Sequence, residues 1–171
     1  YTKGKISDVE IENKSILSKH FKTIEQCYSK APFKNEILNL LSPYYLDNPP
    51  NTLSELNQSL LKTISHYIGI KTKFVNSKDY KLKDTRLDRL IWLNIQLKAS
   101  SYLSGLNAKN YISEYEELLF SDKGIKVKWK HYGPYLEYNR IGKLFNDQVS
   151  IIDLLMNVPQ NELLKHIKSN K

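Results

Sequence analysis

The sequence predicts a helix-rich α/β domain: a three-layer, Rossmann-like arrangement in which crossover helices cover a mostly parallel sheet. First, short apolar segments alternate with longer segments of helical periodicity through the middle of the chain, the pattern of successive β-α-β units. Second, 171 residues are enough for a single domain with a substantial core. Third, a hydrophobic fraction of 40% is typical of globular proteins and excludes a disordered chain.

The predicted strands are short segments. In each of them apolar residues alternate with polar ones, or turn residues lie at the two ends. They are 6–11, 70–75, 101–104 and 125–129. Helical segments separate the last three, so these three are expected to lie parallel in one sheet.

The predicted helices have apolar residues three or four positions apart. Their expected ranges are 16–28, 33–45, 53–68, 85–97, 108–120 and 151–156, followed by a short tail helix within 160–171. Thr52 or Ser54 is expected to cap the third helix and Gly69 to end it, and Asn107 is expected to cap the fifth. Ser150 and Asp153 have the S-x-x-D spacing of a capping box, which predicts a structural role for both side chains.

The charge and cysteine content narrow the classes of partner. The net charge of +8 favours a generally basic surface or an anionic small-molecule partner over nucleic acid. Cys27 is the only cysteine, so no internal disulfide can form and a reducing compartment is expected. No apolar run approaches the ~18 residues of a membrane span. We expect a cytoplasmic protein with no membrane span. Because the chain starts at Tyr1 rather than Met, we also expect an N-terminal portion to be absent.

No known catalytic or cofactor motif occurs in the chain. The four histidines are far apart and show no ligand spacing, so no metal site is predicted. Phosphate-binding glycine motifs are also absent, and no cofactor is predicted. Ser104 lies between a predicted strand and helix, but the G-x-S-x-G pattern of a nucleophile elbow is missing. Cys27 is interpreted as a small buried hydrophobic residue.

The segment 99–111 is the predicted ligand-binding junction, because strand carboxyl ends and helix amino ends meet at such a turn. Gly105 would let a ligand approach the backbone closely. Lys109, expected in the first helical turn, would contact an anion, or would simply be an exposed lysine. Arg86 has the planar fork that suits a carboxylate or phosphate, and an ion pair with Asp84 or Asp88 is the alternative.

Several segments together carry a family resemblance. They are I-G-I-K-T-K-F-V-N-S at 68–77, R-L-D-R-L-I at 86–91, Y-L-S-G-L-N-A-K-N-Y-I at 102–112, G-I-K-V-K-W at 124–129 and S-I-I-D-L-L at 150–155. In this order they resemble the WbqC-like family, whose members are encoded in bacterial polysaccharide (O-antigen) gene clusters. Two features depart from the family pattern: its opening Gln-Pro-x-Tyr-x-Pro-Trp segment is not present, and 157–159 reads N-V-P where the family often has Asn-x-Gly.

The resemblance implies a role in the biosynthesis of cell-surface polysaccharide. It implies a transferase that modifies an amino sugar or a nucleotide-linked sugar, with aminoacyl or glycine transfer as one form, and a nucleotide sugar or activated acyl donor as the anionic substrate. The alternative is a non-catalytic binding or scaffold module of a polysaccharide assembly complex. No catalytic residue is assigned. The expected substrate-binding residues are Ser77, Arg86, Tyr102, Ser104, Gly105, Lys109, Tyr111 and Asp153.

Overall fold

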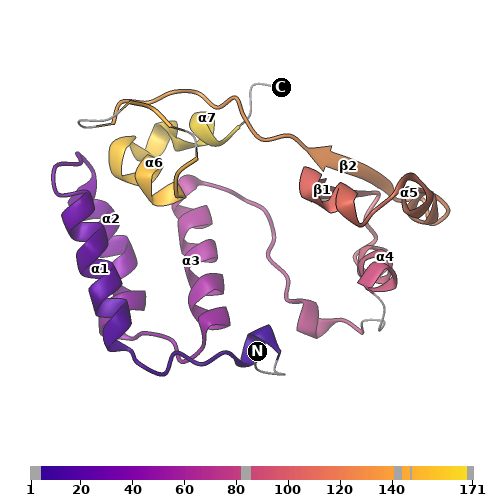
Figure 1. Cartoon of the computed structure of the whole chain (residues 1–171), viewed down its shortest axis with the longest axis horizontal. Helices are drawn as coiled ribbons and strands as arrows, with labels where there is room; N and C mark the ends of the chain where they lie inside the picture. The colour runs from indigo at the N-terminus through magenta and orange to yellow at the C-terminus, as the bar shows by residue number, and fades with distance from the viewer. Residues whose placement is uncertain (1–4, 82–85, 141–143, 147, 169–171) are drawn as a thin grey trace. The chain divides into compact units, whose positions relative to one another are not determined.

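The structure, a computed structural model, describes residues 5–81, 86–140, 144–146 and 148–168 (Figure 1). The chain divides into two compact units. Unit 1 comprises Tyr1–Thr72 and Pro134–Asn170, and unit 2 comprises Lys73–Gly133 together with Lys171. Each unit has its own hydrophobic cluster.

Unit 1 is helical. Its elements are η1 (Ile6–Asp8), α1 (Ser15–Cys27), α2 (Lys34–Ser42), η2 (Pro43–Asp47), α3 (Leu53–Ile68), α6 (Ile151–Asn157), η5 (Gln160–Glu162) and α7 (Leu163–Ile167). Figure 1 shows α6 and α7 lying near the ends of α1, α2 and α3. The core is formed by apolar residues that these helices bury together: Phe21, Ile37, Leu38, Leu41, Ile68, Leu154, Leu155, Met156, Val158 and Leu163.

Local sequence signals set the limits of α3. Thr52 and Glu55 form a capping box, in which the Thr52 hydroxyl accepts from the Glu55 amide and the Glu55 carboxylate accepts from the Thr52 amide. Gly69 ends the helix with φ +87°, a left-handed conformation that glycine adopts without steric cost. Both ends of α3 therefore confirm the sequence-based prediction.

Unit 2 contains a parallel β-α-β unit. Its elements are η3 (Ser77–Asp79), α4 (Arg86–Gln96), β1 (Ser101–Gly105), η4 (Leu106–Asn110), α5 (Glu114–Ser121) and β2 (Lys126–Lys130). β1 and β2 pair in parallel from Ser101↔Lys126 to Gly105↔Lys130, with α5 as the connection. Ile91, Phe120 and Ile125 form the core, and Tyr102 stacks on Phe120 with ring centroids 5.4 Å apart. The predicted parallel pairing of these two strands is confirmed.

The rest of the predicted sheet differs from the structure. Within the described residues the sheet has two strands, so the structure does not confirm a three-layer, Rossmann-like arrangement. Segment 6–11 contains η1 and a single antiparallel bridge between Glu10 and Thr52. Segment 70–75 is not a strand, and its residues from Lys71 onward are exposed. The amide of Ile70 donates to the Ser65 carbonyl (2.9 Å), which holds the start of this segment against the end of α3.

The helix predicted from Ala108 begins only at Glu114. Residues 106–110 form η4, a 3₁₀ helix, and the predicted Asn107 cap is wrong. Ser113 caps α5 instead, because it has Glu116 three residues later and the two form a capping box. The tail helix predicted within 160–171 is present as η5 and α7, and 169–171 lie outside the described residues.

Candidate functional site

The carboxyl ends of β1 and β2 lie at one edge of unit 2, because the strands are parallel and Gly105 is opposite Lys130. The chain enters η4 immediately after Gly105. A Cβ at Gly105 would lie 3.2 Å from the hydroxyl oxygen of Tyr132, closer than most real Cβ contacts. Glycine therefore leaves room for Tyr132, a side chain of this same unit, and a larger residue would require this ring to shift by a few tenths of an ångström.

Arg86, the first residue of α4, lies over the ring of Tyr111 at the end of η4. The guanidinium carbon is 3.8 Å from the ring centroid, which is within cation–π distance. A guanidinium that stacks by its face keeps its N–H groups in its own plane, where they can still donate to an anion. This contact joins the start of α4 to the segment that follows Gly105.

Lys109 lies over the ring of Trp129 on β2, with the ammonium nitrogen 5.3 Å from the ring centroid. The indole N–H of Trp129 donates to Oε1 of Glu117 on α5 (3.2 Å), which fixes the ring. Lys109 and Tyr111 are two residues apart. One short segment therefore carries Lys109 and also the ring on which Arg86 lies. We name the four residues Arg86, Lys109, Tyr111 and Trp129 the cation–ring cluster.

The amino end of α5 offers no anion site. The Glu116 carboxylate accepts from the Ser113 amide (2.6 Å), and the Ser113 hydroxyl accepts from the Glu116 amide (3.4 Å). The hydrogen bond that the Ser113 amide donates to this carboxylate lowers the pKa of Glu116, and the Ser113 side chain lowers it further. Glu114 and Glu117 also lie in the first turn, where negative charge is favourable. The expectation that Lys109 lies in the first turn of this helix is wrong, because Lys109 lies in the last turn of η4.

Of the remaining predicted residues of unit 2, Tyr102 and Ser77 lie outside the cation–ring cluster, whereas Ser104 lies beside one of its members, Trp129. Tyr102 packs against Phe120 in the core. Ser104 pairs with Trp129 in the sheet register. Ser77 begins η3, where its carbonyl accepts from the Tyr80 amide (3.3 Å). Among the described residues, no hydrogen bond or ring contact joins Ser77 to the strand ends.

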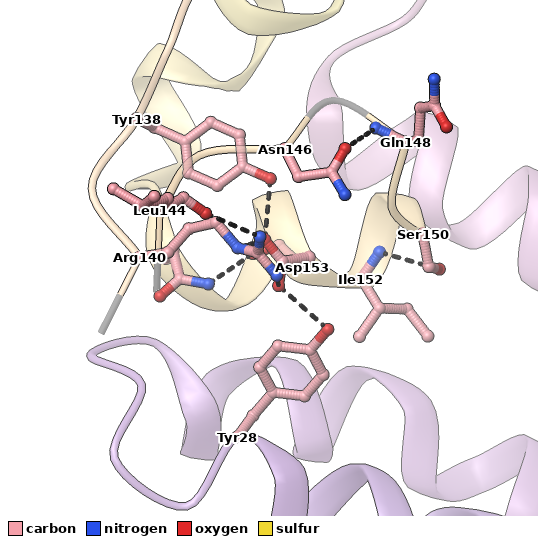
Figure 2. Close-up of polar contacts among 10 residues, drawn as sticks. Tyr28, Tyr138, Arg140, Leu144, Asn146, Gln148, Ser150, Ile152 and Asp153 are labelled. Atoms are coloured by element: carbon pink, nitrogen blue, oxygen red, sulfur yellow. Dashed lines mark hydrogen bonds and ion pairs between the residues drawn. The ribbon is translucent and has the colours of Figure 1, made fainter. Parts of the chain in front are cut away.

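Asp153, the predicted residue of unit 1, is the centre of a buried polar cluster (Figure 2). Arg140 binds its carboxylate with two nitrogens, Nε to Oδ2 at 2.8 Å and Nη2 to Oδ1 at 3.0 Å. Two tyrosine hydroxyls also donate to it, Tyr138 to Oδ2 (2.8 Å) and Tyr28 to Oδ1 (3.2 Å). The side chains of Asp153 and Arg140 are only 4% and 12% exposed. The cluster therefore joins α6, the end of α1 and the segment 134–140.

The capping box predicted for α6 is wrong. The Ser150 hydroxyl accepts from the Ile152 amide (3.3 Å), and the Asp153 carboxylate is engaged with Arg140 and the tyrosines. Burial and the Asp153 carboxylate raise the pKa of Tyr28 to about 12. Burial, followed by the Asp153 hydrogen bond and charge, also raises the pKa of Tyr138.

A hollow of about 290 Å³ adjoins this cluster. Its lining residues are Cys27, Tyr28, Ser29, Lys30, Ala31, Arg140, Asp153 and Asn157. The expectation of a buried Cys27 is wrong, since this thiol is exposed. Sequence reasoning missed Tyr28, Tyr138 and Arg140. The available signal was an aspartate inside the apolar run of α6, because a buried carboxylate requires a partner.

The residues that the structure describes offer neither a metal-binding group nor a membrane-spanning helix. Among them, no group of three or more histidine, cysteine, aspartate or glutamate side chains is arranged to hold a metal ion. Nor does any helix formed by them have the length and apolar character needed to cross a membrane.

The model of the WbqC-like protein family matches residues 1–165. The chain is 38% identical over 154 residues to an uncharacterized protein of Mycobacterium tuberculosis, Rv1507c. That match covers 90% of this chain, and the chain spans 65% of the length of the relative. No solved structure matches. With the family model covering nearly its whole length, the chain belongs to the WbqC-like protein family.

Proposed function

We propose that this chain is part of a transferase of cell-surface polysaccharide (O-antigen) biosynthesis, and that its cation–ring cluster binds the anionic part of the substrate. The substrate is an amino sugar or a nucleotide-linked sugar, and transfer of an aminoacyl group such as glycine is one form of the reaction. Family membership supports the polysaccharide role. The single observation that carries the binding site is the pair of cations held over aromatic rings beside the ends of parallel strands.

The geometry favours an anion because the two cations are held in place before a ligand arrives. Arg86 rests on Tyr111, and Lys109 rests on Trp129, so less side-chain entropy is lost when either one binds. The guanidinium offers a planar fork and the ammonium a compact charge, a combination that suits a diphosphate or a carboxylate. Ligands of α/β proteins bind at this end of parallel strands in general.

The polar cluster of unit 1 is a weaker candidate for the reaction. Each oxygen of the Asp153 carboxylate already accepts two hydrogen bonds, so the carboxylate is poorly placed to act as a base. Its two strongest partners come from one arginine, in the geometry of a structural ion pair. The cation–ring cluster therefore remains the preferred site for the substrate anion.

Binding can be measured by isothermal titration calorimetry of the full chain with a nucleoside-diphosphate sugar, pyrophosphate and the corresponding uncharged sugar. We expect the first two ligands to bind and the uncharged sugar to bind at least tenfold more weakly. Arg86→Gln and Lys109→Gln should each weaken diphosphate binding about tenfold, which is 1.4 kcal/mol. Affinity should also fall as salt increases, because the contacts are ionic.

Lys128→Gln is the matched control. Lys128 is on β2 next to Trp129, but successive residues of a strand face opposite sides of the sheet. The control changes net charge by the same amount and should leave binding within twofold of the wild type. Equal losses in Lys128→Gln and Lys109→Gln would mean a general charge effect and would refute the site. Binding without turnover in the intact protein, given donor and acceptor, would support the scaffold alternative.

A further inference from the structure

A second cavity, of about 260 Å³, lies in unit 1. It is lined by three aromatic side chains from the segment 134–145, by apolar side chains of α6 and α7, and by two polar residues. The lining residues are Tyr135, Tyr138, Phe145, Val149, Ser150, Ile151, Leu154, His166 and Ile167. The volume is close to the lower end of the range for ligand pockets, so the cavity is large enough for one ring.

The existing hydrogen bonds of His166 and Ser150 show which of their polar atoms can still bind a ligand. Nδ1 of His166 lies 3.0 Å from the carbonyl oxygen of Leu136. A carbonyl can only accept, so Nδ1 carries the proton, and Nε2 of the neutral ring is left as an acceptor. The Ser150 oxygen accepts from the Ile152 amide (3.3 Å), which leaves its own hydrogen to donate. Among the described residues, Nε2 of His166 and the hydroxyl hydrogen of Ser150 have no protein partner, so they can serve as an acceptor and a donor for a ligand.

The aromatic wall is held by its own contacts. The Tyr138 ring meets Phe145 edge to face, with centroids 5.2 Å apart, and meets His166 in the same way at 5.6 Å. The Tyr138 hydroxyl donates to Asp153, so the buried ion pair holds in place the Tyr138 ring, which forms one side of the cavity. Figure 2 shows this hydroxyl pointing toward Asp153. A wall fixed in this way preserves the shape of the cavity before a ligand binds.

Of the residues that the structure describes, no aspartate, glutamate, lysine or arginine lines this cavity. A charged ligand group would lose its hydration there without gaining a partner of opposite charge. A ligand rich in hydroxyl groups would also leave several of them unpaired, since the lining offers few polar side chains. A planar, uncharged ring with one donor and one acceptor satisfies both the aromatic lining and the two polar groups.

We propose that this cavity is a binding site for an uncharged planar ring that carries an N–H or O–H donor for His166 and a carbonyl acceptor for Ser150. The site is separate from the cation–ring cluster, and the inference does not depend on the proposed function. It assigns a role to His166, which no catalytic or metal pattern of the sequence explains.

The probe is 2-pyridone, a planar ring with one N–H and one C=O group, titrated into the full chain and followed by NMR. We expect millimolar binding, with intermolecular NOEs from the ring protons to those of Tyr138 and Phe145 in the wild-type protein. His166→Phe keeps a ring but removes the acceptor, and should weaken binding about fivefold or more. The control His20→Phe changes an exposed histidine of α1 and should have no effect.

Three ligand comparisons complete the test. Toluene lacks both polar groups, 6-hydroxynicotinate adds a carboxylate, and glucose is a hydroxyl-rich ring, so each should bind more weakly than 2-pyridone. Equal or tighter binding of any of the three would overturn the proposed ligand class. Absence of the NOEs at saturating 2-pyridone would overturn the site even if His166→Phe failed to fold. Loss of diphosphate binding in Arg86→Gln with 2-pyridone binding retained would show that the two sites are independent.

Discussion

Asp153→Asn should destabilise unit 1 strongly. The substitution keeps the shape of the side chain but removes the charge that binds two nitrogens of Arg140. The Arg140 side chain is only 12% exposed, so its charge would remain buried without a compensating carboxylate. Removing one partner of a buried ion pair costs about 3–5 kcal/mol. For a chain of this size, that loss should lower the melting temperature by roughly 6–20 °C.

The two units can be observed separately in this experiment. Both tryptophans, Trp92 and Trp129, lie in unit 2, so tryptophan fluorescence reports on unit 2 alone. Most of the helical residues belong to unit 1, so far-UV circular dichroism mainly reports on unit 1. In urea, Asp153→Asn should shift the dichroism transition to lower concentration and leave the fluorescence transition nearly unchanged. A coincident shift of both transitions would mean that the units unfold together.

A double-mutant cycle gives the decisive result. Arg140→Met removes the buried positive charge and keeps a side chain of similar length. The double variant Arg140→Met with Asp153→Asn should be less destabilised than the sum of the single variants, by about 2–3 kcal/mol. A cost below 1 kcal/mol for Asp153→Asn, or additive single effects, would contradict the inference that this ion pair stabilises unit 1.

The remaining predictions concern pH, glycine and helix capping. The pKa of Tyr28 is raised from 10.0 to about 12 in the folded protein, so the folded state holds this proton more tightly than the unfolded state does. The stability that this shift contributes should therefore be fully present below pH 10 and be lost as the pH rises through about 12, and Tyr28→Phe should reduce that loss in urea titrations. Gly69→Ala and Gly124→Ala each place a side chain at positive φ without a close contact, and each should lower the free energy of unfolding by about 1–2 kcal/mol. Circular dichroism should report the loss from Gly69→Ala in unit 1, and tryptophan fluorescence the loss from Gly124→Ala in unit 2. Thr52→Ala and Ser113→Ala each remove a capping box and should cost about 1 kcal/mol, whereas serine at position 52 should restore the stability.

The elements that sequence reasoning predicted well are those with local signals. The helix ended by Gly69 has a capping threonine, a helical apolar pattern and a glycine at its end, all within one segment. The start of α5 also had a local signal. Asn107 and Ser113 can both cap, but only Ser113 has a glutamate three residues later. The glutamate three residues after Ser113 therefore sets the start of α5.

The contacts that sequence reasoning missed are not local. Tyr28 and Asp153 are 125 residues apart, and their hydrogen bond forms only once α1 and α6 pack together. A local rule predicts Asp153 as a helix cap and the family resemblance predicts it as a substrate-binding residue, and neither prediction identifies its buried partners. The predicted strand 70–75 is wrong for a related reason. Alternating apolar and polar residues indicate a segment that could lie in a sheet, but a strand forms only where a neighbouring strand pairs with it. A single sequence does not show which segments will lie side by side.

The two groups of charged residues call for different tests because their surroundings differ. At Asp153 the protein itself supplies a full set of hydrogen-bond donors, so a substitution there should change stability far more than binding. Arg86 and Lys109 rest on rings, so substitutions there should change stability little and anion binding strongly. Measuring both properties in Asp153→Asn and Arg86→Gln separates the two roles. If Asp153→Asn at a temperature where it remains folded lost anion binding as severely as Arg86→Gln, the buried ion pair would have to be counted as part of the substrate site.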